Sequence, residues 1–162
     1  MYKYGHVGAA LLLYAPVGFL LLTSGLGELA VLGGLLSIAL STLPDADHSL
    51  PLVSHRGITH TVYFALGIGV FVGLLGYLSA DLLDYDPLLL AAVGFGVSTL
   101  AICSHLLADS ITPMGIRPFA PLWGWHYSAN VVPAKNPIAN FLLLATGIMA
   151  VTVALVLAVV TL

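Results

Sequence analysis

The chain has 162 residues, of which 60% are hydrophobic and only 7% are charged, and its formal net charge is −3. A soluble domain carries about 25% charged residues, so this composition excludes a water-soluble globular protein. No basic tract is present, and nothing in the charge distribution indicates nucleic-acid binding. The apolar residues form long runs, which predict a single all-α domain over residues 1–162, a polytopic protein of the lipid bilayer.

A transmembrane helix needs about 20 apolar residues, within a range of about 17–25. Pro16 lies within the first run and no clear small-x-small cleavage site follows, which favours a retained helix over a signal peptide. The connection 112–137 contains five prolines and is expected to lie over the membrane face as a lid. Five transmembrane helices are predicted: 7–23, 28–43, 57–80, 87–111 and 138–162.

The charged residues separate onto two sides when the chain is threaded through these five helices. Lysine and arginine on one side predict the cytoplasmic face, so we expect an inner-membrane, multi-pass protein with its N-terminus inside and its C-terminus outside. The basic residues all lie on the side of the N-terminus: Lys3, Arg56, Arg117 and Lys135. Four acidic residues lie on the other side: Glu28, Asp81, Asp84 and Asp86.

The same threading places all six histidines on the cytoplasmic side, together with three aspartates. His105 and Asp109 are four residues apart and therefore share a helical face, as Arg56 and His60 would if both lie in the third helix. The histidines are His6 at the start of the first helix, His48 and His55 in the loop 44–56, His60 early in the third helix, His105 in the fourth, and His126 in the last loop; the aspartates are Asp45, Asp47 and Asp109.

Buried ionisable residues in this pattern favour a metal site. A carboxylate such as Asp109 within an apolar run costs about 2.5–3.5 kcal/mol at mid-bilayer depth unless it is paired or bound to metal. Neutral imidazole and carboxylate suit zinc, with manganese and iron left open, and the number of candidate groups allows one to three ions. Taken singly, Asp45 or Asp47 is also typical of a polar turn. His126 lies in an aromatic run suited to the membrane interface.

Three motifs in order resemble those of the YdjM-type membrane-bound hydrolases: Pro-Asp-Ala-Asp-His at 44–48, His-Arg-Gly-Ile-Thr-His at 55–60, and His-Leu-Leu-Ala-Asp-Ser-Ile-Thr-Pro-Met-Gly at 105–115. The resemblance extends from His6 to about Pro121. It implies a LexA-regulated, inner-membrane, metal-dependent hydrolase, and the His-xxx-Asp element is also similar to zinc-dependent phospholipase C enzymes. The residues of interest that it implies are His6, Asp45, Asp47, His48, His55, Arg56, His60, His105 and Asp109, together with Thr112 and Gly115.

These residues predict metal-assisted hydrolysis, in which a bound ion lowers the pKa of its water towards about 7. Arg56, Asp45 and Thr112 are the predicted catalytic residues. Arg56 is suited to hold a phosphate bidentately, although it is equally typical of a positive-inside anchor. A site at headgroup level favours a phosphoester or phosphodiester of a lipid or another interfacial substrate. A metal or proton transporter that uses the same cluster is the alternative, and a metal-stabilised scaffold is a third possibility.

Overall fold

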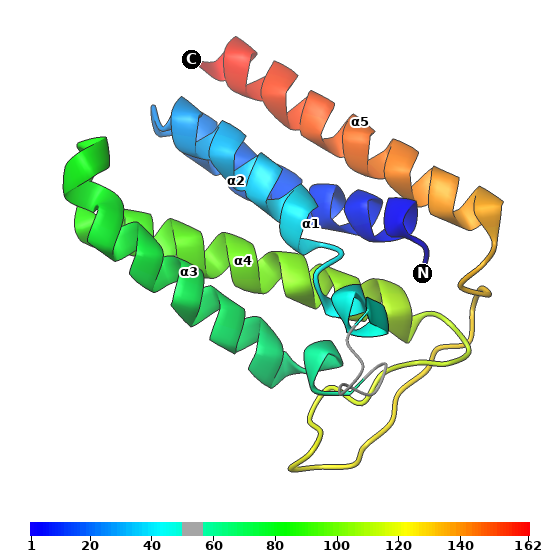
Figure 1. The fold of residues 1–162 in the computed structure, drawn as a ribbon. Helices are drawn as coiled ribbons and strands as arrows, with labels where there is room; N and C mark the ends of the chain where they lie inside the picture. Colours follow the sequence, from blue (N-terminus) through cyan, green and yellow to red (C-terminus); the bar gives the residue numbers. More distant parts are fainter. Residues whose placement is uncertain (50–56) are drawn as a thin grey trace.

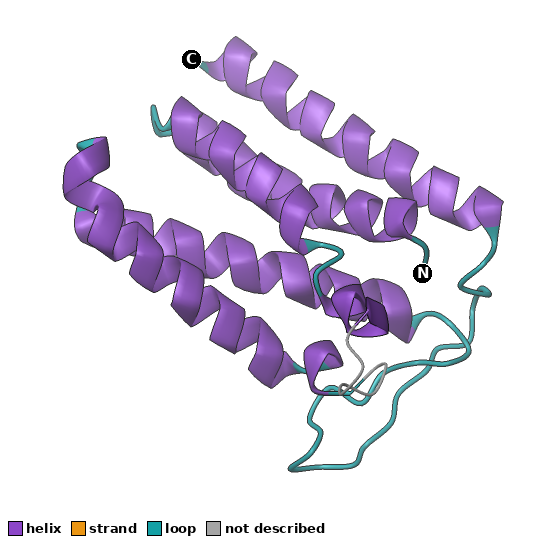
Figure 2. Ribbon diagram, in the orientation of Figure 1, coloured by secondary structure: helices purple, strands orange, loops and turns teal. Residues whose placement is uncertain are grey.

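The computed structural model describes residues 1–49 and 57–162 and confirms an all-helical membrane protein (Figure 1). Within the described residues the only strand-like pairing is an isolated bridge between Ile116 and Tyr127, and the remaining structure is helix and loop (Figure 2). The long helices are α1 (Lys3–Thr23), α2 (Gly27–Leu40), α3 (Val62–Leu83), α4 (Pro87–Ser110) and α5 (Pro137–Thr161), and two 3-10 helices are η1 (Pro44–Ser49) and η2 (Ile58–His60).

Glycines allow these helices to pack in two close pairs, α1 with α5 and α3 with α4 (Figure 1). A Cβ atom at Gly147 would lie 2.3 Å from the carbonyl oxygen of Gly8, and one at Gly73 would lie 3.0 Å from that of Ala91. Small residues at such crossings let helix backbones approach in lipid, where no hydrophobic force drives helices together. Helix α4 also contacts α1 and α2, and it therefore joins the two pairs.

The polar breaks between the helices follow the sequence prediction. Asp86 accepts a hydrogen bond from the Leu89 amide at 2.8 Å, and Pro87 occupies the first turn of α4. Asn136 caps α5 in the same way, again followed by proline. A side-chain acceptor before a helix-starting proline satisfies amides that have no partner within the helix. The starts of α4 and α5 are therefore determined locally.

The third helix begins later than the predicted residue 57, and the prediction that His60 lies early in this helix is wrong. His60 ends η2, and the extended residue Thr61 caps α3 by accepting a hydrogen bond from the Phe64 amide at 3.2 Å. The threonine cap begins α3 after Thr61, so His60 lies before this helix. The second helix likewise ends at Leu40 rather than residue 43, although the candidate span extends through η1 to Asp47.

The basic side chains of the described residues lie at one end of the bundle. The N-terminus, η1, η2 and the loop between α4 and α5 lie at one end, and the α1–α2 and α3–α4 turns lie at the other (Figure 1). The first end carries Lys3 and Lys135, whereas the second carries Glu28 and the turn that contains Tyr85. The Tyr85 hydroxyl donates a hydrogen bond to Glu28 Oε2 at 3.0 Å, and this bond raises the pKa of the tyrosine.

The loop 112–137 extends beyond the helix ends, at the same end of the bundle as η1 and η2 (Figure 1, Figure 2). The Val62 amide donates to its Pro118 carbonyl at 2.8 Å, which ties the loop to the start of α3. Its aromatic rings stack in a series with centroids 5.7–6.1 Å apart, comprising Phe119, Trp123, Trp125 and Tyr127. The position expected of a lid over the membrane face stays a prediction.

Candidate metal centre

Four separate elements bring five of the predicted site residues together at one end of the bundle. His6 comes from α1, Asp45 from η1, His60 from η2, and His105 with Asp109 from α4. The side chains of the three histidines and Asp109 are at most 1% exposed, whereas that of Asp45 is 29% exposed. The cluster is therefore buried on all sides except near Asp45.

A backbone hydrogen bond orients the His105 ring. His105 Nδ1 lies 2.7 Å from the carbonyl oxygen of Ser41, the residue at the end of α2. A carbonyl oxygen can only accept, so Nδ1 carries the proton and Nε2 of the neutral ring has a free lone pair. That Nε2 atom faces the cluster, at 3.6 Å from Asp45 Oδ1. A hydrogen bond from the ring nitrogen that does not bind the ion commonly orients metal-binding histidines.

His60 is oriented by a side-chain pair on its outer edge. The Thr59 hydroxyl donates to Asp47 Oδ2 at 2.8 Å and lies 3.0 Å from His60 Nδ1. Since the hydroxyl proton points to the carboxylate, the hydroxyl oxygen accepts from Nδ1–H, and the Nε2 lone pair of His60 faces inward. Asp47 lies behind His60, with Oδ2 3.4 Å from Nδ1. The ligand role that the sequence predicted for Asp47 stays a prediction.

Three inward-facing atoms have the spacing of ligands around one ion. His60 Nε2 lies 3.2 Å from His105 Nε2, and Asp45 Oδ1 lies 3.5 and 3.6 Å from these two nitrogens. In a tetrahedral zinc site with bonds of about 2.1 Å, neighbouring ligand atoms are about 3.4 Å apart. Two imidazole lone pairs that face each other at 3.2 Å also require a cation or a proton between them. The chemistry and spacing of this triad fit a divalent metal.

A second group comprises His6, His105 and Asp109, all buried, and its donor atoms also lie within 4.8 Å of one another. The His6 ring stacks on that of His105, with centroids 3.6 Å apart and planes 10° apart. His6 Nδ1 is buried and has no hydrogen-bond partner among the described residues. The Met1 amino group donates to Asp109 Oδ1, and His6 Nε2 lies 3.0 Å from the Met1 carbonyl oxygen. Because His105 has only one inward-facing nitrogen, Nε2, it can bind an ion in only one of the two groups at a time.

The structure assigns other contacts to several predicted residues. The Thr112 hydroxyl donates to the Asp109 carbonyl at 2.8 Å, where it stabilises the turn after α4. Gly115 has a φ of +59°, and a Cβ there would lie 2.2 Å from the Tyr127 carbonyl, so its role is conformational. His126 is exposed, and its Nε2 lies 2.9 Å from the Met114 carbonyl. The His48 side chain, His55 and Arg56 lie outside the described residues.

Two residues that support the site were absent from the sequence prediction, namely Ser41 and Thr59. Ser41 contributes only its backbone carbonyl, so no side-chain pattern could reveal it. Thr59 directly precedes His60, so a hydroxyl next to a candidate ligand in the sequence could have indicated a residue that supports it.

Comparison with known proteins identifies a family for the whole chain. The family model described as YdjM inner membrane protein matches residues 1–162. No match was found among curated proteins or among solved structures. The whole-chain match is to an inner membrane family, and the structure has five candidate membrane spans. The chain therefore belongs to the YdjM inner membrane protein family.

Proposed function

We propose that this protein is a metal-dependent membrane hydrolase that cleaves a phosphoester or phosphodiester of a lipid. The observation that carries the proposal is the triad of Asp45, His60 and His105, whose three donor atoms lie 3.2–3.6 Å apart. Catalytic zinc sites use three protein ligands and leave a fourth position for water or substrate, whereas structural sites are closed. The partial exposure of Asp45 supports access to such a position.

Each residue of the cluster has a separate role in this proposal. Asp45, His60 and His105 would hold a divalent ion, for which zinc suits two imidazoles and a carboxylate, and such an ion would lower the pKa of water towards about 7. Asp109 Oδ2 lies 3.7 and 3.8 Å from the inward nitrogens of His60 and His105, and we assign it as the acceptor of the water proton. His6 stacks on His105 and holds its ring in place. Arg56 remains the sequence-predicted phosphate ligand.

The position of the cluster supports a lipid substrate. Asp45 follows α2 at the end of a candidate membrane span, and His60 precedes α3 at the start of another. Lipid phosphates lie at this level, where the hydrocarbon region meets the headgroups. A soluble phosphoester would reach the same groups only from the aqueous side. The preference for a lipid substrate therefore rests on the depth of the cluster in the membrane.

The test measures phosphate release by purified, zinc-loaded protein in nanodiscs from phosphatidic acid and from a panel of phosphodiester lipids. We expect Asp45→Asn to lower turnover by more than about a hundredfold, because even outer-shell partners of a metal contribute 10–100-fold. Asp81→Asn, the same change at the exposed far end of α3, should leave turnover unchanged. Protein that retains zinc but hydrolyses none of these lipids would refute the hydrolase proposal.

The support of His60 by Thr59 and Asp47 leads to a prediction about metal affinity. Thr59→Val removes the hydroxyl that accepts from Nδ1–H and donates to Asp47. We expect zinc affinity to fall by about 10–100-fold, as for other outer-shell changes. Thr59→Ser keeps the hydroxyl and should retain most of the affinity. Competition with a chelating dye measures both, and equal affinities of the valine and serine variants would contradict the assignment.

We further propose that the end of the bundle with the metal centre faces the cytoplasm, because Lys3, Arg117 and Lys135 all lie there. Single cysteines introduced in a Cys103→Ser background test this orientation in intact cells. A membrane-impermeant maleimide should label Leu162→Cys, at the exposed C-terminus, and should label Lys135→Cys only after the cells are lysed. The reverse pattern would place the site outside.

Transport by the same cluster is the alternative, and two buried hydroxyls bear on it. Ser37 and Ser98 are buried, and their hydroxyls have no hydrogen-bond partner among the described residues. Ser98 lies two turns from His105, so polar groups continue about 10 Å towards the far side. Residues 87–97 of α4 then carry no polar side chain. The absence of a polar path in this half of α4 favours hydrolysis, and zinc uptake into sealed vesicles would reverse that preference.

A further inference from the structure

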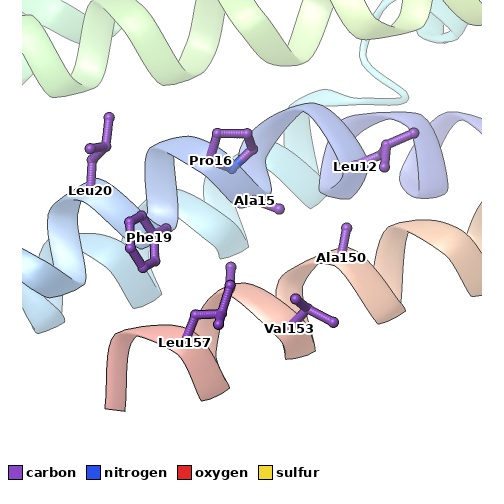
Figure 3. Close-up of a pocket in the computed structure, with 9 residues that line it drawn as sticks. Leu12, Ala15, Pro16, Phe19, Leu20, Ala150, Val153 and Leu157 are labelled. Carbon is purple, nitrogen blue, oxygen red and sulfur yellow. The ribbon is translucent and has the colours of Figure 1, made fainter. Parts of the chain in front are cut away.

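Exposed apolar side chains lie both within the candidate membrane spans and outside them. Within the spans their partner is the bilayer, as in the groove between α1 and α5, where Phe19 and Val153 lie among other apolar side chains (Figure 3). A contiguous apolar surface outside the spans indicates a further interaction site. Most exposed large apolar side chains of the described residues outside the spans belong to the loop 112–137: Met114, Leu122, Trp123, Trp125, Tyr127 and Val131.

The loop 112–137 forms a hairpin with a cluster of aromatic rings at its tip. The backbone amides and carbonyls of Ile116 and Tyr127 bond to each other at 2.9 and 3.0 Å, which closes the hairpin. Beyond this bridge, each of the rings of Phe119, Trp123 and Trp125 contacts the other two, with centroids 5.7–6.1 Å apart. The side chains of Trp123 and Trp125 are nonetheless 61% and 43% exposed, so the described residues leave much of their surface uncovered.

A hydrogen bond places the start of this tip level with the start of a membrane span. The Val62 amide donates to the Pro118 carbonyl at 2.8 Å, and Val62 is the first residue of α3 and of the candidate span Val62–Leu83. Phe119 directly follows Pro118, so the ring cluster begins where the hydrocarbon region meets the headgroups. Tyr63, which is exposed in the first turn of α3, lies at the same level. Aromatic side chains from two elements therefore share one depth.

The charge of the loop suits the phosphates of lipid headgroups. Residues 112–137 include Arg117 and Lys135 but no aspartate or glutamate, whereas the whole chain has a net charge of −3. Both basic side chains are exposed. Basic residues next to a bilayer are attracted to its anionic lipids. The charge and the aromatic composition of the loop therefore indicate the same partner.

We infer that the tip of the loop, residues 119–125, inserts into the headgroup region of the bilayer that the five helices span. Tryptophan is enriched at this depth because its ring is largely apolar while its N–H group still reaches water or headgroups. A second copy of the chain could also cover the rings. Two copies joined symmetrically at this loop would bring like charges together, however, and lipid phosphates instead complement the basic side chains.

The chain contains two tryptophans, Trp123 and Trp125, so its tryptophan fluorescence reports on the tip alone. The protein is reconstituted in vesicles of phosphatidylcholine and phosphatidylglycerol whose acyl chains carry bromine either near the headgroup or near the middle of the bilayer. Bromine quenches tryptophan on contact, and acrylamide on both sides of the vesicle membrane quenches tryptophan from the water. Trp123→Phe and Trp125→Phe resolve the two rings, and N-acetyl-tryptophanamide gives the acrylamide quenching of a fully hydrated tryptophan.

We expect bromine near the headgroup to remove more of the emission than bromine near the middle of the bilayer, and acrylamide to quench less than it quenches the free amide. Leu122→Asp places a charge at a tip position that is 80% exposed, and it should reduce the loss to bromine and increase the loss to acrylamide. Val131→Asp is the matched control, at a 73% exposed position whose amide donates to the Ile111 carbonyl at the end of α4. It should leave both losses unchanged.

Acrylamide quenching equal to that of the free amide, without any loss to bromine, would place the tip in water and overturn the inference. Greater loss to bromine near the middle of the bilayer would overturn it as well, because the rings would then lie in hydrocarbon. Protection from both quenchers would show that protein, such as a second copy, covers the rings. If Leu122→Asp does not fold, the wild-type emission still decides. These outcomes are independent of zinc and of phosphate release, so they leave the proposed hydrolysis to its own test.

Discussion

Replacing His105 by alanine is expected to abolish zinc binding. His105 belongs to both candidate ligand groups, and its Nε2 is the atom that the two groups share. Its removal leaves His60 and Asp45 as two donors, which is fewer than the three that catalytic zinc sites employ. We expect the affinity to fall by far more than the 10–100-fold typical of outer-shell changes. Metal content by plasma mass spectrometry and a zinc titration measure the loss.

His126→Ala is the matched control, because His126 is exposed in the loop after α4 and contacts the Met114 carbonyl rather than the cluster. It should bind zinc as wild type does. A second variant, His105→Gln, keeps a side chain in the buried position and distinguishes loss of a ligand from loss of the fold. Retention of near-stoichiometric zinc by His105→Ala would contradict the site, as would equal losses in His105→Ala and His126→Ala.

The second large effect is expected at Gly147, where a single methyl group should separate two helices. A Cβ there would lie 2.3 Å from the Gly8 carbonyl oxygen, which belongs to backbone and cannot rotate away. Overpacking of this kind costs about 1–3 kcal/mol, and more where backbones must move. We expect Gly147→Ala to lower the free energy of unfolding by at least about this amount, measured by denaturation of detergent-solubilised protein.

Gly67→Ala provides the control for Gly147→Ala, because a Cβ at Gly67 meets nothing within 4 Å. Alanine is favoured over glycine within a helix by about 0.8–1.0 kcal/mol in water, so Gly67→Ala should leave stability unchanged or slightly raised. If both variants unfold alike, the close crossing of α1 and α5 is incorrect. Displacement of α5 should also release the Tyr2 amide from Asn140 Oδ1, which lies 2.9 Å away and anchors the chain before His6.

The helices and the location of the polar residues could be predicted from the sequence because both depend on local properties. Runs of apolar residues are long enough to span a membrane, and Asp86–Pro87 and Asn136–Pro137 begin helices by local capping. Because the chain crosses the membrane at each span, the order of the five spans then predicts on which side each histidine lies. His105 and Asp109 also remain four residues apart on one helix, as predicted.

The arrangement inside the site depended on contacts between elements, which residue spacing does not encode. The Ser41 carbonyl orients His105 across 64 residues of sequence, and the Thr59 hydroxyl connects Asp47 to the outer edge of His60. The Thr61 cap begins the third helix after His60, so His60 lies outside that helix. The sequence by itself determined which groups reach one end of this membrane protein, because that depends on the length and polarity of the spans. Only the tertiary structure decided which atoms face one another, because hydrogen bonds from distant elements set the tautomers and orientations of the histidine rings.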